Sequence, residues 1–197
     1  MEITTGNTPQ AIQDETLLIR HILDGDTKLF RQLAGRYAEQ VLRMVARLIP
    51  SPEEAEEATQ DTLVEAFQSL SRYDARQASF RTWLMRIAYH MALKHYRQKH
   101  RSLHMVEVEQ QRLDAFPDDE TDVLLDDTDR LTFMERAIDM LKPDDQMLLS
   151  LYYFDDRPIR DIASITEHSE GYLRSRLQWI RKRLAINIKS LESNENK

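Results

Sequence analysis

The sequence SFRTWLMRIAYHMALKHYRQKHR, residues 79–101, predicts a single amphipathic helix. Its apolar side chains recur at steps of three and four residues, which places them on one helical face. Ser79 stands just before them and can cap the N-terminus of the helix. The apolar face carries Phe80, Trp83, Leu84, Ile87 and Met91, and the opposite face carries Arg81, Arg86, Lys94, Arg97, Lys99 and Arg101.

Aromatic side chains are mixed into this helix at Phe80, Trp83, Tyr89 and Tyr96. A helix that is both basic and aromatic suits a ligand with negative phosphates and flat bases. A second interpretation is equally open for the helix alone, namely a core-packing helix whose charged face is solvated. The remainder of the chain has to distinguish a nucleic-acid interface from an ordinary core helix.

The composition favours helices and excludes several classes of protein. The chain has 197 residues, of which 41% are hydrophobic and four are glycine, and it is rich in residues of high helix propensity. It has no cysteine, which excludes disulfides, thiolate catalysis and cysteine-based zinc sites. The N-terminus lacks the features of a signal peptide, and no apolar run approaches the roughly 18 residues of a membrane span. We expect an all-α protein with a cytoplasmic location and no membrane insertion.

The net charge of −7 conceals a strong segregation of charge along the chain. Residues 72–101 hold eight Lys or Arg and one acid, and residues 157–189 hold eight Lys or Arg and three acids. Residues 102–129 hold ten acids and one base, and residues 51–70 hold six acids and no base. Two basic blocks therefore alternate with two acidic ones, which the overall charge does not reveal.

The periodic segments predict two small helical domains, 14–101 and 128–190, joined by an acidic flexible linker at 102–127. The linker loses apolar periodicity, and a short helical piece around 105–113 is the one element that it could contain. In the first domain we expect helices over 14–23, from Thr27 to about Pro50, over 51–70 and over 79–101. In the second we expect helices over 128–141, 143–153 and 158–163, a break at 164–168, and a long final helix from Ser169.

A short helix, a turn and a basic helix at the C-terminus match a helix-turn-helix. In such a motif the start of the second helix enters the major groove, where phosphate contacts position it and exposed side chains contact base edges. An ordinary helical hairpin with a solvated basic face is the alternative. The candidate DNA-binding residues are Ser169, Glu170, Tyr172, Arg174, Ser175 and Arg176, with Arg181 farther along the helix.

The sequence offers no catalytic or metal site. The four glycines are scattered and form no phosphate-binding loop. His100 and His104 have helical i,i+4 spacing, but no acidic ligand joins them in a metal-binding motif. We therefore expect no enzymatic activity, no cofactor and no metal.

Three N-terminal segments resemble region 2 of bacterial extracytoplasmic-function RNA polymerase sigma factors, the group IV members of the sigma-70 family. They are DGDTKLFRQLAGRY at 24–37, EEATQDTLVEAFQSL at 56–70 and FRTWLMRIAYHMALKHYRQ at 80–98. Two C-terminal segments, LKPDDQMLLSLYYFDDRPIRDIA at 141–163 and SEGYLRSRLQWIRKRL at 169–184, resemble region 4 of the same family. Their order and the acidic linker between them agree with the family.

The resemblance implies a role for each basic or acidic block. Region 2 of the family docks on core RNA polymerase and opens the −10 element, region 4 contacts the −35 element, and the linker lies near the RNA path. The implied core-polymerase contacts are Glu57, Gln60, Asp61, Thr62 and Glu65. The resemblance places base selection in the loop 72–78 and makes the following helix its support. The residues of the predicted helix-turn-helix are the implied −35 contacts. The implied −10 contacts are Arg72, Tyr73, Arg76, Ser79, Arg81, Arg86, Tyr89, Lys94, Tyr96 and Arg97.

The implied partners are core RNA polymerase, promoter DNA and an anti-sigma factor. The chain departs from the family pattern before the last helix, where a small apolar residue, a glycine and another apolar residue are usual. Those positions hold Thr166, Glu167 and His168 here, and Tyr172 with Leu173 follows Gly171 in place of Thr-Val. A self-sufficient helix-turn-helix regulator with an N-terminal sensor domain is the alternative function.

Overall fold

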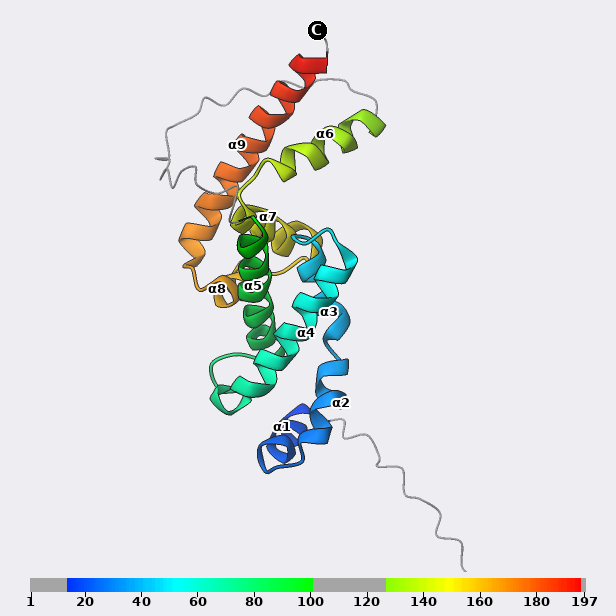
Figure 1. Ribbon diagram of the computed structural model, residues 1–197. Coiled ribbons are helices and arrows are strands. Elements are labelled where there is room, and N and C mark those ends of the chain that lie inside the picture. Colours follow the sequence, from blue (N-terminus) through cyan, green and yellow to red (C-terminus); the bar gives the residue numbers. More distant parts are fainter. Residues whose placement is uncertain (1–13, 101–126, 196–197) are drawn as a thin grey trace, which may run out of the picture.

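A computed structural model describes residues 14–100 and 127–195. These two ranges contain helices and no strand (Figure 1). The prediction of an all-α fold is confirmed for them. The N-terminal domain comprises α1 (Glu15–Leu23), η1 (Thr27–Leu29), α2 (Phe30–Gly35), α3 (Ala38–Ala46), α4 (Pro52–Ser69), η2 (Leu70–Arg72) and α5 (Phe80–Lys99). The C-terminal domain comprises α6 (Asp127–Asp139), α7 (Pro143–Leu149), the π-turn η3 (Ser150–Phe154), α8 (Ile159–Thr166) and α9 (Glu170–Glu195).

Helix α5 lies at the centre of the molecule (Figure 1). It packs against α3 and α4 of its own domain and against α7 and α8 of the other domain. Its predicted stripe is buried at Phe80 and Leu84, but the burial extends to Met85, Ala88 and Tyr89. The predicted stripe is therefore too narrow, because the C-terminal domain covers a second face of the helix.

Hydroxyl caps start the helices where the sequence predicts them. The Ser79 hydroxyl accepts a hydrogen bond from the Thr82 backbone N–H at 3.2 Å, and that of Ser51 accepts one from the Glu54 N–H at 3.4 Å. The Ser169 hydroxyl accepts from the Tyr172 N–H at 3.2 Å. These contacts satisfy backbone donors that a helix N-terminus leaves without intrahelical partners.

The long helix predicted from Thr27 to about Pro50 is wrong, because this segment is divided into η1, α2 and α3. Thr27 begins a 3₁₀ turn and caps no long helix. The break follows Gly35, and Tyr37 leaves helical geometry with φ −122° and ψ −12°. This turn directs Tyr37 into the aromatic cluster, 5.6 Å from Phe80 between ring centroids, and its hydroxyl donates to Glu15. Burial and that acidic partner raise the pKa of Tyr37 to about 12.

Three boundaries in the C-terminal domain also differ from the prediction. The expected break at 164–168 is shorter, because α8 continues to Thr166 and buries Ile165. Within this segment Glu167 takes the left-handed conformation, with φ +60°, at the position where the family commonly has glycine. Asp127, placed in the linker from sequence, belongs to α6, and α9 continues past 190 to Glu195. The remainder of the predicted linker, with its possible helical piece at 105–113, lies outside the described residues.

The two domains contact each other along α5. The Arg86 Nε–H donates to the Ser164 carbonyl at 2.9 Å, and the Tyr89 hydroxyl donates to Asp144 at 3.3 Å. At the other edge the Arg47 guanidinium lies 4.4 Å from the centre of the Phe154 ring. The structure is therefore a closed arrangement, in which the C-terminal domain covers part of the basic helix.

Candidate polymerase and promoter interfaces

The acidic face of α4 is accessible at most of its predicted contacts. Glu57, Gln60 and Asp61 are exposed and Glu65 is half-buried. The Asp61 carboxylate lies 2.9 Å from the Nε2 atom of His95 on α5, which holds it in place on the surface. The face therefore presents a polar surface of fixed geometry to a partner.

Thr62 was predicted to contact polymerase with these residues, and the structure corrects that prediction. Its side chain is completely buried, and its hydroxyl donates to the Ala58 carbonyl at 2.7 Å. It points into the domain and cannot touch a polymerase.

The sequence interpretation missed Val64, which is 54% exposed, and Phe67, which is 39% exposed. Exposed apolar side chains beside polar ones are typical of a protein interface, and helical spacing from Gln60 could have identified them.

The loop before α5 is ordered by its own side chains. The Arg76 guanidinium donates to both carboxylate oxygens of Asp74, at 2.8 Å to the nearer one. These bonds lower the pKa of Asp74 below its ordinary range, with a further contribution from the Arg76 backbone N–H. Tyr73 packs edge-on against Phe80 at 5.6 Å, and its hydroxyl donates to the Ala78 carbonyl at 3.2 Å. Tyr73 thus supports the loop, while Arg72 and Arg76 project from it.

The basic residues of α5 divide into two groups. Arg81 and Lys94 are exposed, and Arg81 is oriented by a 2.8 Å hydrogen bond to Gln40. Tyr96 is half-buried and stacks on His100, with 4.0 Å between ring centroids. Arg86 and Tyr89 face the C-terminal domain, so the expectation that both lie open to DNA is wrong for this arrangement: Tyr89 is only 4% exposed.

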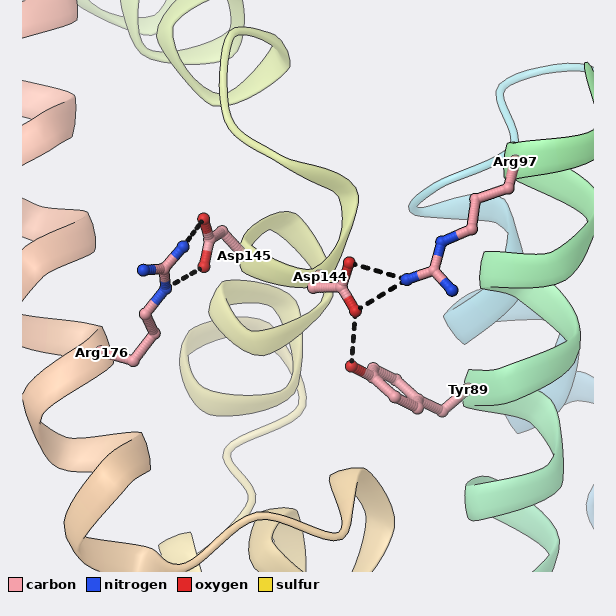
Figure 2. A network of polar contacts seen from close by, with 5 residues as sticks. All are labelled: Tyr89, Arg97, Asp144, Asp145 and Arg176. Carbon is pink, nitrogen blue, oxygen red and sulfur yellow. Dashed lines mark hydrogen bonds and ion pairs between the residues drawn. The ribbon is translucent and has the colours of Figure 1, made fainter. Parts of the chain in front are cut away.

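Two adjacent carboxylates at the start of α7 link the helices on either side (Figure 2). Asp144 accepts hydrogen bonds from the Tyr89 hydroxyl at 3.3 Å and from Arg97 at 3.1 Å, both on α5. Asp145 accepts two from Arg176 on α9, at 2.6 and 2.8 Å. Burial, followed by the charge and the hydrogen bond of Asp144, raises the pKa of Tyr89. One carboxylate therefore joins the two domains and its neighbour joins two helices within one domain.

Helix α9 exposes most, but not all, of its predicted DNA contacts. Tyr172, Arg174, Ser175 and Arg181 are exposed, and Arg174 is paired with Glu170 at 2.7 Å. Arg176 is the exception, because the structure does not leave this predicted DNA contact exposed. Its guanidinium lies 4.2 Å from the Trp179 ring centre and is held by Asp145, which is only 2% exposed. Burial alone would lower the pKa of Arg176, but the hydrogen bonds and charge of Asp145 outweigh it and raise the pKa.

Two chemical alternatives find no support in the described ranges. Within residues 14–100 and 127–195, no group of three or more His, Asp or Glu side chains is arranged to hold a metal ion. A helix that is long and apolar enough to cross a membrane is likewise absent from that part of the chain.

The sequence matches the family models for sigma-70 region 2 over residues 33–102 and for sigma-70 region 4 over residues 134–184. The chain belongs to the sigma-70 family. This sigma factor is 29% identical over 185 residues to the ECF RNA polymerase sigma-E factor of Escherichia coli K12, covering 89% of this chain and 93% of that protein. It is 25% identical over 172 residues to the RNA polymerase sigma-H factor of Pseudomonas aeruginosa, covering 84% and 89% respectively. It is therefore an ECF sigma factor that directs RNA polymerase to promoters, and its family consists of initiation factors, not enzymes.

Solved structures show the same fold. This sigma factor matches CnrH, solved in complex with the cytosolic domain of CnrY, with a TM-score of 0.59 and 19% identity over 88% of this chain and 96% of that one. It matches RpoE from Bartonella quintana, solved in complex with the anti-sigma factor NepR, with a TM-score of 0.56 and 21% identity over 81% and 96%. These matches confirm the helical fold predicted from sequence, and the alternative of a self-sufficient regulator is not favoured.

Proposed function

We propose that the two domains of this sigma factor divide promoter recognition between them. Residues 14–101 bind core polymerase through the exposed side of α4 and contact the −10 element through the loop 72–79 and α5. Residues 128–190 contact the −35 element through the start of α9. The observation that supports this division most directly is the pair of separate exposed surfaces, acidic and apolar on α4 but basic on the loop and on α9.

The structure refines the residues that we propose for each surface. The polymerase surface comprises Glu57, Gln60, Asp61, Val64 and Glu65. The −35 surface comprises Ser169, Glu170, Tyr172, Arg174, Ser175 and Arg181, without Arg176. The −10 surface available in the closed arrangement comprises Arg72, Arg76, Arg81, Lys94 and Tyr96, supported by Tyr73 and Ser79.

Arg86, Tyr89 and Arg97 complete the −10 surface only after the domains separate. In the closed arrangement Arg86 is bound to Ser164, and Asp144 accepts from both Tyr89 and Arg97. A DNA strand cannot occupy the same side of α5 as α7 and α8. The proposed function therefore requires that the domains part when the sigma factor engages polymerase and promoter.

An anti-sigma factor is a further proposed partner, because the two similar structures described above, CnrH and RpoE, were each solved with a second protein bound. A cytoplasmic location follows from the proposed action on polymerase and chromosomal DNA.

Replacing Gln60 and Asp61 together with alanine is expected to weaken binding to core polymerase by about tenfold or more, as for interface residues that contribute strongly to affinity. Both side chains are exposed, so the thermal midpoint of the free protein should change little. Competition with a labelled wild-type chain for core polymerase measures the affinity, and circular dichroism measures the midpoint.

The matched control is Glu39→Ala, which removes an exposed acid from α3, outside the proposed surface. It should compete as well as the wild type. Equal affinities for all three proteins would contradict the assignment of α4, and a large fall in the midpoint of the double variant would show that the two residues are structural.

A further inference from the structure

The C-terminal domain has a cavity of about 650 Å³ between the segment that precedes α8 and the first turns of α9. Arginines from both elements and two tyrosines from the first of them converge on it. Its lining includes Tyr152, Tyr153, Arg157, Ile159, Arg174 and Arg181. Two of these residues belong to the exposed side of α9 proposed above to contact the −35 element, so the cavity opens beside that surface.

Arg157 is the unusual member of this group. It is only 8% exposed, yet its Nε–H group has no hydrogen-bond partner. Its backbone is fixed, because the Arg157 N–H donates to the Leu151 carbonyl at 3.0 Å. A buried donor without a partner reduces the stability of the fold. The position therefore holds a guanidinium with one N–H donor that the described part of the protein does not itself satisfy.

Charges of both signs act on the Arg157 guanidinium. Burial lowers the pKa of the Arg157 guanidinium, and the positive charge of Arg81 acts in the same direction, opposed by Asp155 and Asp161. Neither of those two acids lines the cavity; the acid that does so is Asp156. The guanidinium nevertheless remains charged at physiological pH, because arginine is not deprotonated in proteins.

The two arginines of α9 that line the cavity are each held by one hydrogen bond. The Arg181 Nε–H donates to the Tyr153 hydroxyl at 2.8 Å, which fixes one edge of its guanidinium. Glu170 accepts from Arg174 at 2.7 Å. Arg174 and Arg181 are seven positions apart, two turns along the same helical face, so both reach the same cavity from α9.

We propose that Arg157, Arg174 and Arg181 together bind one backbone phosphate of the promoter duplex. A phosphate in the cavity would lie beside the Arg157 guanidinium, which lines it, and guanidinium groups match phosphate in charge and hydrogen-bond geometry. Duplex DNA is the source because a helix-turn-helix is held in the major groove by phosphate contacts that flank its recognition helix. The inference rests on the proposed function of α9 and adds to it a buried residue outside that helix.

The test uses holoenzyme assembled from core polymerase and the full chain, with a promoter duplex that the wild-type holoenzyme transcribes. Arg157→Met keeps an unbranched side chain and removes the guanidinium. We expect it to weaken binding to the duplex about tenfold and to lower the slope of log affinity against log salt by about one. Because both holoenzymes contain the same polymerase, its own DNA contacts cancel in the comparison.

Arg43→Met is the matched control, since Arg43 lies on α3 outside every surface proposed above, has a 55% exposed side chain and does not line the cavity. It should leave both affinity and slope unchanged. Binding and slope equal to wild type in Arg157→Met would overturn the phosphate site while leaving the proposed function intact. A wild-type holoenzyme that transcribes no promoter would instead show that the proposed function itself is wrong.

Two further measurements separate binding from folding and DNA from free phosphate. The thermal midpoint of Arg157→Met should equal or exceed that of the wild type, because a buried donor without a partner is removed. Arg157→Lys, which retains the charge, should keep the wild-type salt slope, and loss of the slope in this variant would overturn the proposal. Inorganic phosphate, at ionic strength matched with chloride, should not raise the wild-type midpoint; a rise that Arg157→Met abolishes would assign the cavity to free phosphate and not to DNA.

Discussion

Asp145→Ala is expected to destabilise the C-terminal domain by about 3 kcal/mol. Asp145 is 2% exposed and accepts two hydrogen bonds from Arg176 at 2.6 and 2.8 Å (Figure 2). Removing one partner of a buried ion pair leaves the other charge uncompensated, which typically costs about 3–5 kcal/mol. The lower end applies here, because the Arg176 side chain is 24% exposed and retains some contact with water.

Asp144→Ala is the matched control for this variant, because it removes the same group from the preceding position. The Asp144 side chain is 51% exposed, and exposed pairs contribute about 0.2–1 kcal/mol. Replacing both partners in Asp145→Ala with Arg176→Met should recover most of the lost stability. Equal effects of the two single alanine variants would contradict the assignment of Arg176 to the domain interior.

Urea denaturation followed by tryptophan fluorescence can measure this difference within one domain. The chain has two tryptophans, Trp83 in the N-terminal domain and Trp179 beside Arg176. In a Trp83→Phe background the remaining tryptophan reports on the C-terminal domain alone. This separation matters because a two-domain chain need not unfold in a single transition.

Joining position 90 to position 167 with a covalent cross-link is expected to reduce promoter-dependent transcription to the level of core polymerase alone. His90 Nε2 and Glu167 Oε2 lie 3.5 Å apart across the domain interface, so cysteines placed there fall within reach of a short bis-maleimide. The locked chain keeps Arg86, Tyr89 and Arg97 against the C-terminal domain, where they cannot contact DNA. The natural sequence contains no cysteine, so the reagent would react only at the two introduced sites.

A bis-maleimide with an internal disulfide makes the lock reversible, and reduction should restore transcription. His90→Cys alone, treated with the same reagent, controls for modification of α5 without closure. Full transcription by the locked protein would show that the closed arrangement is compatible with promoter opening. The interdomain ion pairs are largely exposed, and pairs of this kind contribute about 0.2–1 kcal/mol each.

Helix ends and the core of each domain could be predicted from sequence where local chemistry determines them. Ser79 caps α5 as predicted, and Ser51 and Ser169 stand at the predicted starts of their helices and cap them. Phe80 and Leu84 of the predicted apolar stripe are buried on α5. The broken helix after Thr27 was not predictable in the same way. The turn at Tyr37 is stabilised by its contacts with Phe80 and Glu15, which lie far away in the sequence.

The candidate sites were predictable as regions but not always as residues. Arg174 and Arg176 look equivalent in sequence, yet one is exposed and the other is bound to Asp145 inside the domain. Tyr89 is covered because the second domain lies on α5, and helical periodicity within one segment carries no information about a distant domain. Glu167 shows the opposite case, in which a difference visible in the sequence has no effect on the backbone. It stands where the family commonly has glycine, and it still takes the left-handed conformation of that turn.

Run-off transcription with purified core polymerase, the full chain and fragmented genomic DNA tests the central claim, that this chain selects promoters through two domains. The account predicts discrete transcripts whose start sites share one upstream motif near −10 and a second near −35. Replacing Arg174 with alanine should weaken transcription from these sites, and that variant should be least active where the −35 motif is strongest. The account would be contradicted by transcripts no different from those of core polymerase alone, together with tight binding of the free protein to duplex DNA as a dimer.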